Sequence, residues 1–241
     1  MAISKRKALL WAYLVALHAI VFVCLTKTNL IEKIQSKFSS EIIDNTQSKY
    51  YRSLVAFHAR IDNNLPNNSI IFIGDSHIQG LAISAVTEPS ANYGIGKDTT
   101  TGVIKRLPQY TALNHAKAVV LAIGFNDLVF SSPQQIGLNL EQLVQAIPGD
   151  YPIYLNAVFP VGDWLPDAQN INRKIVKVNA YYQELANIRK RVHYLQTFND
   201  NAYQIGLSHQ FLLSDGIHLS KEGNQAWISM LKEALSQREN K

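Results

Sequence analysis

Four polar residues of this sequence, Ser76, Asn126, Asp215 and His218, have side chains that could together carry out acyl transfer. A serine hydroxyl attacks a carbonyl only when a base takes its proton, and histidine suits that task best near neutral pH. An aspartate three residues before the histidine can hold the imidazole in the required tautomer. An asparagine amide can donate a hydrogen bond to an oxyanion. The set therefore predicts a nucleophile, a base, its partner and an oxyanion donor.

Each of the four residues also has a structural interpretation that the sequence leaves open. Ser76 and Asp215 are residue types that cap helices, and Asn126 is common in turns. His218 has the alternative of a surface or core histidine. The positions of these residues relative to the predicted strands favour the chemical interpretation.

Two of the four residues come directly after buried strands. The apolar run Ser69–Ile73 precedes Gly74, Asp75 and Ser76, and the run 118–123 precedes Asn126. Short apolar runs rich in β-branched residues are typical of buried strands. In open α/β folds, ligands bind at the carboxyl ends of such strands. We interpret Asp75 as structural, and we expect the neighbouring His77 to point away from the site.

Strands and helices alternate over the remainder of the chain. The expected strands are 69–73, 91–93, 118–123, 152–158 and 192–195. The expected helices are 77–86, 98–107, 136–146, 171–189 and 221–237. This alternation predicts an α/β fold in which a parallel sheet is covered on both faces by helices.

A glycine-containing loop, Gly94–Gly102, follows the second expected strand. Its spacing matches neither of the two common phosphate-binding patterns. Glycines permit tight backbone geometry, so the loop can direct a backbone N–H group into a site. We expect that N–H group to come from Gly96 or Lys97.

Four blocks in this order resemble the SGNH (GDSL-type) hydrolase family over about residues 69–235. The blocks are Gly74-Asp75-Ser76, the Asn92 to Thr100 loop, Gly124-Phe125-Asn126-Asp127 and Asp215-Gly216-Ile217-His218. The resemblance implies a flavodoxin-like three-layer α/β/α sandwich with a five-stranded parallel sheet.

The resemblance also implies a role for each matching residue. Ser76 would be the nucleophile, His218 the base and Asp215 its partner, and the oxyanion hole would use the backbone of Ser76 and the side chain of Asn126. Many relatives carry a glycine where this chain has Lys97. A lysine can supply the same backbone N–H if the position does not require a positive φ, so the choice between Gly96 and Lys97 stays open.

Charge and cysteine content exclude several functional classes. The net charge is +5, yet only 19 basic residues oppose 18 acidic ones from residue 30 onward, so the excess lies at the N-terminus. We therefore expect no nucleic-acid partner, which would need a basic patch on the folded domain.

The single cysteine, Cys24, permits no intrachain disulfide and no cysteine-based metal site. The inferred chemistry needs no metal and no cofactor.

The N-terminal part of the chain predicts a membrane anchor. Residues 8–26 are apolar apart from His18, and three basic residues precede them, which places residues 1–7 in the cytoplasm. A cleaved signal peptide is the alternative, but no Ala-x-Ala cleavage site follows. Residues 27–65 form a predicted helical stalk and linker, with an amphipathic helix that packs on its own domain or on a partner helix. Residues 66–241 form the hydrolase domain.

These features predict a single-pass membrane protein whose catalytic domain is extracytoplasmic, and periplasmic in a Gram-negative cell. We expect a serine esterase that cleaves acyl esters, with a preference for short chains because no long apolar insertion is present. Its substrate would be an acylated envelope glycan or lipid near the membrane. Two alternatives are an O-acyltransferase acting on envelope glycan through the same site, and a non-catalytic glycan-binding module.

Overall fold

The computed structural model of the protein describes residues 6, 11, 13–18 and 45–237. The chain divides into two compact units, Met1–Asp44 and Asn45–Lys241. Within the described residues, no helix is long and apolar enough to cross a membrane, so the predicted anchor is not supported there. Most of that anchor, and the predicted stalk before residue 45, lie outside the described residues.

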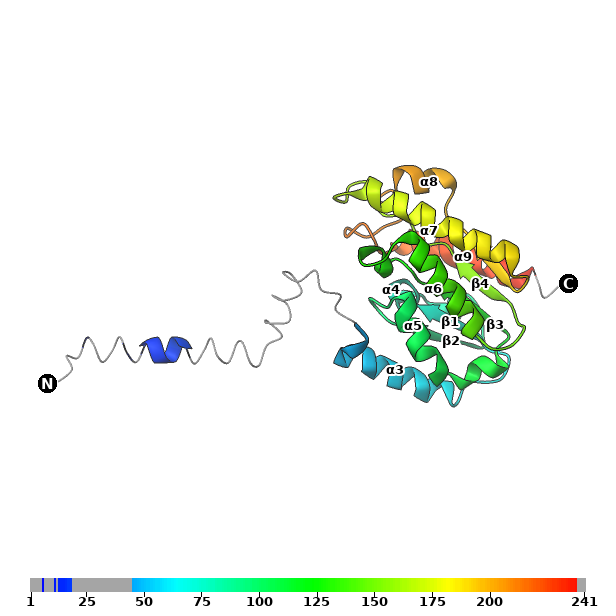
Figure 1. Ribbon diagram of the computed structural model, residues 1–241, viewed down its shortest axis with the longest axis horizontal. Helices are drawn as coiled ribbons and strands as arrows, with labels where there is room; N and C mark the ends of the chain where they lie inside the picture. The colour runs from blue at the N-terminus through cyan, green and yellow to red at the C-terminus, as the bar shows by residue number, and fades with distance from the viewer. Residues whose placement is uncertain (1–5, 7–10, 12, 19–44, 238–241) are drawn as a thin grey trace. The chain divides into compact units, whose positions relative to one another are not determined.

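A five-stranded sheet forms the centre of the second unit (Figure 1). Its strands are β1 (Ile70–Gly74), β2 (Ser90–Gly94), β3 (Ala118–Ala122), β4 (Ile153–Asn156) and β5 (Val192–Leu195). All neighbours pair in parallel, in the order β2-β1-β3-β4-β5. This is the flavodoxin-like order, so the predicted α/β fold with a five-stranded parallel sheet is confirmed.

The carboxyl ends of the three strands nearest the site lie level with one another. In the sheet register, Gly74 of β1 pairs with Gly94 of β2 and with Ala122 of β3. A Cβ atom on Gly74 would lie 1.9 Å from the carbonyl oxygen of Ala122, so only glycine fits where β1 ends. The chain segments that leave these strands therefore begin side by side at one edge of the sheet.

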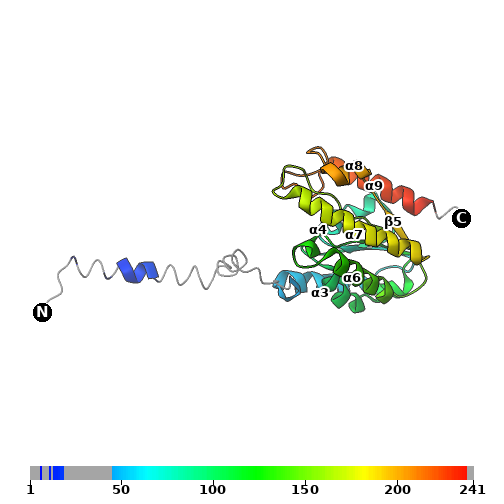
Figure 2. The same ribbon diagram turned by 45° about the horizontal axis from the view of Figure 1, so that its top comes forward.

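Helices cover both faces of the sheet. They are α4 (Ser76–Gly80), α5 (Thr100–Arg106), α6 (Pro133–Ala146), α7 (Ala168–Ile188), α8 (Asp200–Ile205) and α9 (Lys221–Ser236). Helix α6 packs against both α5 and α7, which Figure 1 shows as one layer, and Figure 2 shows α6 and α7 side by side. Helix α4 connects β1 to β2, against the direction of the later connections, so a right-handed crossover places it on the opposite face of the sheet. The ring of Phe159 contacts both His77 of α4 and Trp227 of α9, which places α9 beside α4.

Two helices differ from the sequence-based expectation. The helix predicted at 77–86 ends at Gly80, because Leu81 is extended, and a short 3-10 helix, η2 (Ile83–Ala85), follows. Helix α8 was not predicted. Asn199 caps it and Gly206, with a φ of 99°, ends it, so its six residues are defined by local capping rather than by apolar periodicity.

Helix α3 (Lys49–Asp62) belongs to the same compact unit as the sheet. Ser48 caps its first turn, and a 3-10 helix, η1 (Asn45–Gln47), precedes it. The buried face of α3 consists of Tyr51, Val55, His58 and Asp62. The compact unit thus begins at Asn45, within the segment expected to be a stalk, and α3 covers its own domain.

Candidate active site

Ser76, His218 and Asp215 form a continuous hydrogen-bonded relay. The Oγ atom of Ser76 lies 2.9 Å from Nε2 of His218, and Nδ1 of His218 lies 2.7 Å from Oδ2 of Asp215. Ser76 is the first residue of α4, directly beyond the end of β1, and 142 residues separate it from His218. In this geometry His218 can take the proton of the serine hydroxyl while Asp215 stabilises the resulting imidazolium.

The loop before α9 holds Asp215 in place through its own backbone. Oδ1 of Asp215 accepts hydrogen bonds from the N–H groups of Ile217 and His218, at 2.9 and 3.0 Å. Desolvation alone would raise the pKa of Asp215. The bond from the Ile217 N–H and then those from His218 outweigh it, so the pKa lies below its ordinary value. Asp215 is therefore an ionised partner for the imidazole at neutral pH.

The loop between β2 and α5 makes a tight turn beside the serine. The Asp98 N–H donates to the Ile95 carbonyl at 3.0 Å, and the third residue of the turn, Lys97, has a φ of 65°. Such turns favour glycine at that position. The position does have a positive φ, so the condition set on the lysine is not met, but Lys97 adopts the left-handed conformation and keeps its backbone N–H in the turn.

The backbone N–H groups of the two candidate donors differ in their hydrogen bonds. The Gly96 N–H donates to Oε1 of Gln79 at 2.6 Å. The Lys97 N–H has no hydrogen-bond partner within residues 45–237, and neither does the backbone N–H of Ser76. Of Gly96 and Lys97, therefore, only Lys97 has a backbone N–H without a partner in the part of the chain that the structure describes.

Asn126 connects the end of β3 to this same turn. It begins the 3-10 helix η5 (Asn126–Val129), and its Nδ2 donates to the carbonyl of Asp98 at 2.9 Å. An amide group has two N–H donors, so one stays available. The neighbouring Asp127 is buried and accepts the backbone N–H of Thr100, which holds α5 against η5.

The sequence-based expectation that His77 points away from the site is wrong. Its ring centroid lies 5.4 Å from that of His218 and 5.1 Å from that of Phe159. Burial, and then the charge of His218, lower the pKa of His77 to about 3, so its ring is neutral at physiological pH. Helix α4 is too short for its periodicity to reveal this direction, so the sequence carried no signal for it.

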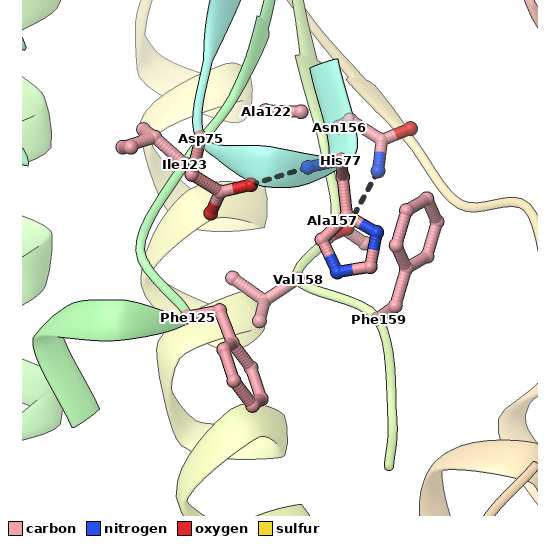
Figure 3. A pocket seen from close by; sticks show the side chains of 9 residues that line it. All are labelled: Asp75, His77, Ala122, Ile123, Phe125, Asn156, Ala157, Val158 and Phe159. Atoms are coloured by element: carbon pink, nitrogen blue, oxygen red, sulfur yellow. Dashed lines mark hydrogen bonds between the residues drawn. The ribbon is translucent and has the colours of Figure 1, made fainter. Parts of the chain in front are cut away.

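Asp75 and His77 line a small cavity under the end of β1 (Figure 3). Its volume is about 10 Å³, the space of one water molecule. Oδ1 of Asp75 accepts the His77 N–H at 3.0 Å and so caps α4, in agreement with the structural interpretation of Asp75. Burial raises the pKa of Asp75 to about 7.

Within residues 45–237 no group of three or more acidic, histidine or cysteine side chains is arranged to hold a metal ion.

Comparison with known proteins agrees with this geometry. Residues 72–226 match the model of the GDSL-like lipase/acylhydrolase family. A structure from Streptococcus pneumonia, provisionally described as a platelet activating factor, is 26% identical with a TM-score of 0.68, covering 78% of this chain and 93% of that one. No curated protein matches the sequence.

Two more distant structures share the fold. A GDSL-like lipase from Bacteroides thetaiotaomicron is 17% identical with a TM-score of 0.64, covering 76% of this chain and 98% of that one. An acetylxylan esterase from Geobacillus stearothermophilus is also 17% identical, with a TM-score of 0.55 and coverage of 69% and 93%. Because the family model spans more than half of the chain, this protein belongs to the GDSL-like lipase/acylhydrolase family and is an ester-bond hydrolase.

Proposed function

We propose that the protein is a serine esterase in which Ser76 attacks the ester carbonyl. The observation that supports this most strongly is the unbroken relay from Asp215 through His218 to Ser76, with contacts of 2.7 and 2.9 Å. Neutral histidine accepts the serine proton through Nε2 while Nδ1–H donates to the Asp215 carboxylate. The serine oxygen then bonds to the carbonyl carbon, and the carbonyl oxygen becomes an anion.

Three donors are available to that oxyanion: the backbone N–H groups of Ser76 and Lys97, and the side-chain amide of Asn126. His218 next gives its proton to the departing alcohol, which leaves an acyl group on Ser76. A water molecule, deprotonated by the same histidine, then releases the acyl group as an acid. Removing one donor of this kind typically costs about 2.7–4 kcal/mol of transition-state stabilisation.

Short acyl groups are the proposed substrates. Within residues 45–237, no long apolar insertion that could cover a fatty acyl chain interrupts the α/β alternation, and Ser76 and His218 are both partly exposed. The test is hydrolysis of p-nitrophenyl acetate, octanoate and palmitate by the wild type and by Ser76→Ala. We expect acetate to be cleaved fastest and the variant to be inactive on all three. Equal activity of Ser76→Ala would refute the assignment of the nucleophile.

The location of the protein is proposed from its sequence. Three basic residues followed by the apolar segment 8–26 favour a single anchor with its N-terminus in the cytoplasm. The esterase domain would then lie outside the cytoplasmic membrane, close to acylated envelope glycans or lipids. An ester carried by such a molecule is the proposed natural substrate.

A further inference from the structure

We propose that the start of helix α3 positions the oxyanion hole, with Tyr50 acting through Gln79 on the turn that carries Lys97. This inference rests on the proposed function, because it concerns the donors of the same site. Tyr50 and Gln79 are positioning residues here, since neither belongs to the Ser76, His218 and Asp215 relay.

Gln79 links α3 to the turn through both ends of its amide. Its Nε2 donates to the Tyr50 hydroxyl oxygen at 2.6 Å, and its Oε1 accepts the Gly96 N–H at 2.6 Å. The Gly96 N–H can only donate, so it requires Oε1 of Gln79 to face it, and the Tyr50 hydroxyl holds the other end of the amide in place. If the amide turned over, an N–H would face the Gly96 N–H, and the turn would lose its support.

Two further contacts join the same segment to the same turn. Nδ2 of Asn45 donates to the Gly96 carbonyl at 3.2 Å, so both polar groups of the Gly96 backbone are held from outside the turn. The Tyr51 hydroxyl donates to Oδ1 of Asp98 at 3.2 Å, and Asp98 is buried in an ion pair with Arg106. Residues 45–51 thus contact the turn at Gly96 and at Asp98, the two residues that flank Lys97.

The consequence for the site follows from the geometry of the turn. With the Gly96 N–H occupied by Gln79, the next N–H along the chain, that of Lys97, remains for the substrate. Gly96 also lies beside the nucleophile, because a Cβ on Gly96 would be 3.9 Å from Cβ of Ser76. A displacement of about 1 Å can cost a factor of about 100 in rate, so a contact that fixes the turn influences catalysis without touching the substrate.

The experiment compares Tyr50→Phe, Gln79→Met and the double variant in the full-length chain, with p-nitrophenyl acetate as the substrate. We expect kcat to fall about three- to tenfold in Tyr50→Phe and at least as much in Gln79→Met, with KM unchanged, because the donors act mainly in the transition state. The double variant should fall no further than Gln79→Met, because Tyr50 acts through Gln79. The pH dependence of kcat/KM should not shift, since the Asp215 and His218 relay is intact.

The matched control is Tyr181→Phe on α7. The two tyrosines are exposed to similar extents, 52% for Tyr50 and 38% for Tyr181, so both changes remove one hydroxyl at the surface. The control should retain wild-type kcat, and the melting temperatures of the four variants should lie within about 2 °C of that of the wild type. Unchanged kcat in Tyr50→Phe, or losses that multiply in the double variant, would overturn the proposal.

Failure of this inference is distinguishable from failure of the proposed function. If the wild type does not hydrolyse the ester, the proposed function fails. If the wild type is active and Tyr50→Phe matches it, only the positioning role fails. A loss of kcat that accompanies a large fall in melting temperature would indicate a general structural role and would also count against the proposal.

Discussion

Lys97 has a backbone conformation that its side chain disfavours, at the point where the site needs a backbone donor. Its φ of 65° places it in the left-handed region, and its side chain is exposed. For residues other than glycine this conformation costs about 1–2 kcal/mol. The cost is offset by the turn, which the hydrogen bond from Asp98 to Ile95 closes. The backbone of Lys97, rather than its side chain, is thus the part that the proposed mechanism uses.

The first prediction concerns Lys97→Gly. Glycine relieves the strain. It also makes the unfolded chain more flexible, which lowers the free energy of unfolding by about 0.4–1 kcal/mol. We expect the free energy of unfolding in urea to rise by about 0.5–1 kcal/mol, with kcat for p-nitrophenyl acetate retained. The control, Lys97→Ala, keeps the strain and should match the wild type. A tenfold loss of kcat in Lys97→Gly would show that the side chain takes part in catalysis.

Asp75 has an unusual protonation state because it is enclosed under the end of β1. Its pKa is raised to about 7 by burial, whereas an unfolded aspartate titrates near 3.8. Between these two values the unfolded chain loses its proton and the folded chain keeps it. The folded state therefore loses stability as the pH rises from about 4 to 7, by up to about 4 kcal/mol.

The second prediction follows for Asp75→Asn, which cannot ionise but can still accept the His77 N–H. The free energy of unfolding of the variant, minus that of the wild type, should increase between pH 4 and pH 7 and stay constant above. Denaturant unfolding of both proteins at pH 4, 5.5, 7 and 8.5 measures this difference. The lowered pKa of His77 makes the stability of the folded state rise with pH, but this contribution is present in both proteins and cancels in the difference. A difference that does not change with pH would contradict the buried, protonated Asp75.

At the scale of elements, helix α3 contributes polar contacts that the sheet domain needs. Asp62, at its last turn, accepts hydrogen bonds from the Tyr93 hydroxyl and from the backbone N–H groups of Thr111 and Ala112, at 2.7 to 3.1 Å. Near its start, Tyr51 bonds to Asp98, which pairs with Arg106 in the interior. Without α3 the buried Tyr93 hydroxyl and the buried Asp98 would each lose a partner, at a cost of about 1–3 kcal/mol for each unsatisfied group.

The third prediction compares two shortened chains. A chain that begins at Asn45 should fold and hydrolyse p-nitrophenyl acetate at the wild-type rate. A chain that begins at Asn64 lacks α3 and should melt at least 10 °C lower, or fail to fold. Circular dichroism during heating measures both. Equal melting temperatures would mean that α3 is a dispensable stalk.

At the scale of the whole molecule, the parallel sheet brings the end of β1, the turn after β2 and the end of β3 to one edge, and the loop before α9 reaches the same place. Residues 76, 97, 126 and 218 meet there although up to 142 residues separate them. The alternation of strands and helices, and the four blocks, were sufficient to predict the sheet and the relay. The sheet follows from short apolar runs that alternate with helices, and the relay residues follow from the residue types in the four blocks.

The parts that the sequence did not predict depend on contacts between distant segments. Gln79 bonds to Tyr50 across 29 residues, and the direction of the His77 ring is defined by Phe159 and His218. The positive φ at Lys97 comes from closure of the turn, since lysine itself gives no indication of it. No periodicity or spacing encodes such contacts, so only the structure could reveal them.

The fourth prediction concerns the N-terminal segment. If residues 8–26 form an anchor, the full-length chain should sediment with membranes and resist extraction by alkaline carbonate. The chain that begins at Asn45 should remain in the supernatant. Immunoblotting of the two fractions measures this difference. Release of the full-length chain by carbonate would contradict the proposed anchor.

The fifth prediction tests the central claim, that Ser76 is activated by His218. The full-length chain, with Ser76→Ala and His218→Ala beside it, is treated with a fluorophosphonate probe and analysed by intact mass and peptide mapping. We predict one equivalent of label on Ser76 in the wild type and none in either variant. A folded wild-type chain that takes up no label, or that is labelled at another serine, would contradict this account of the site.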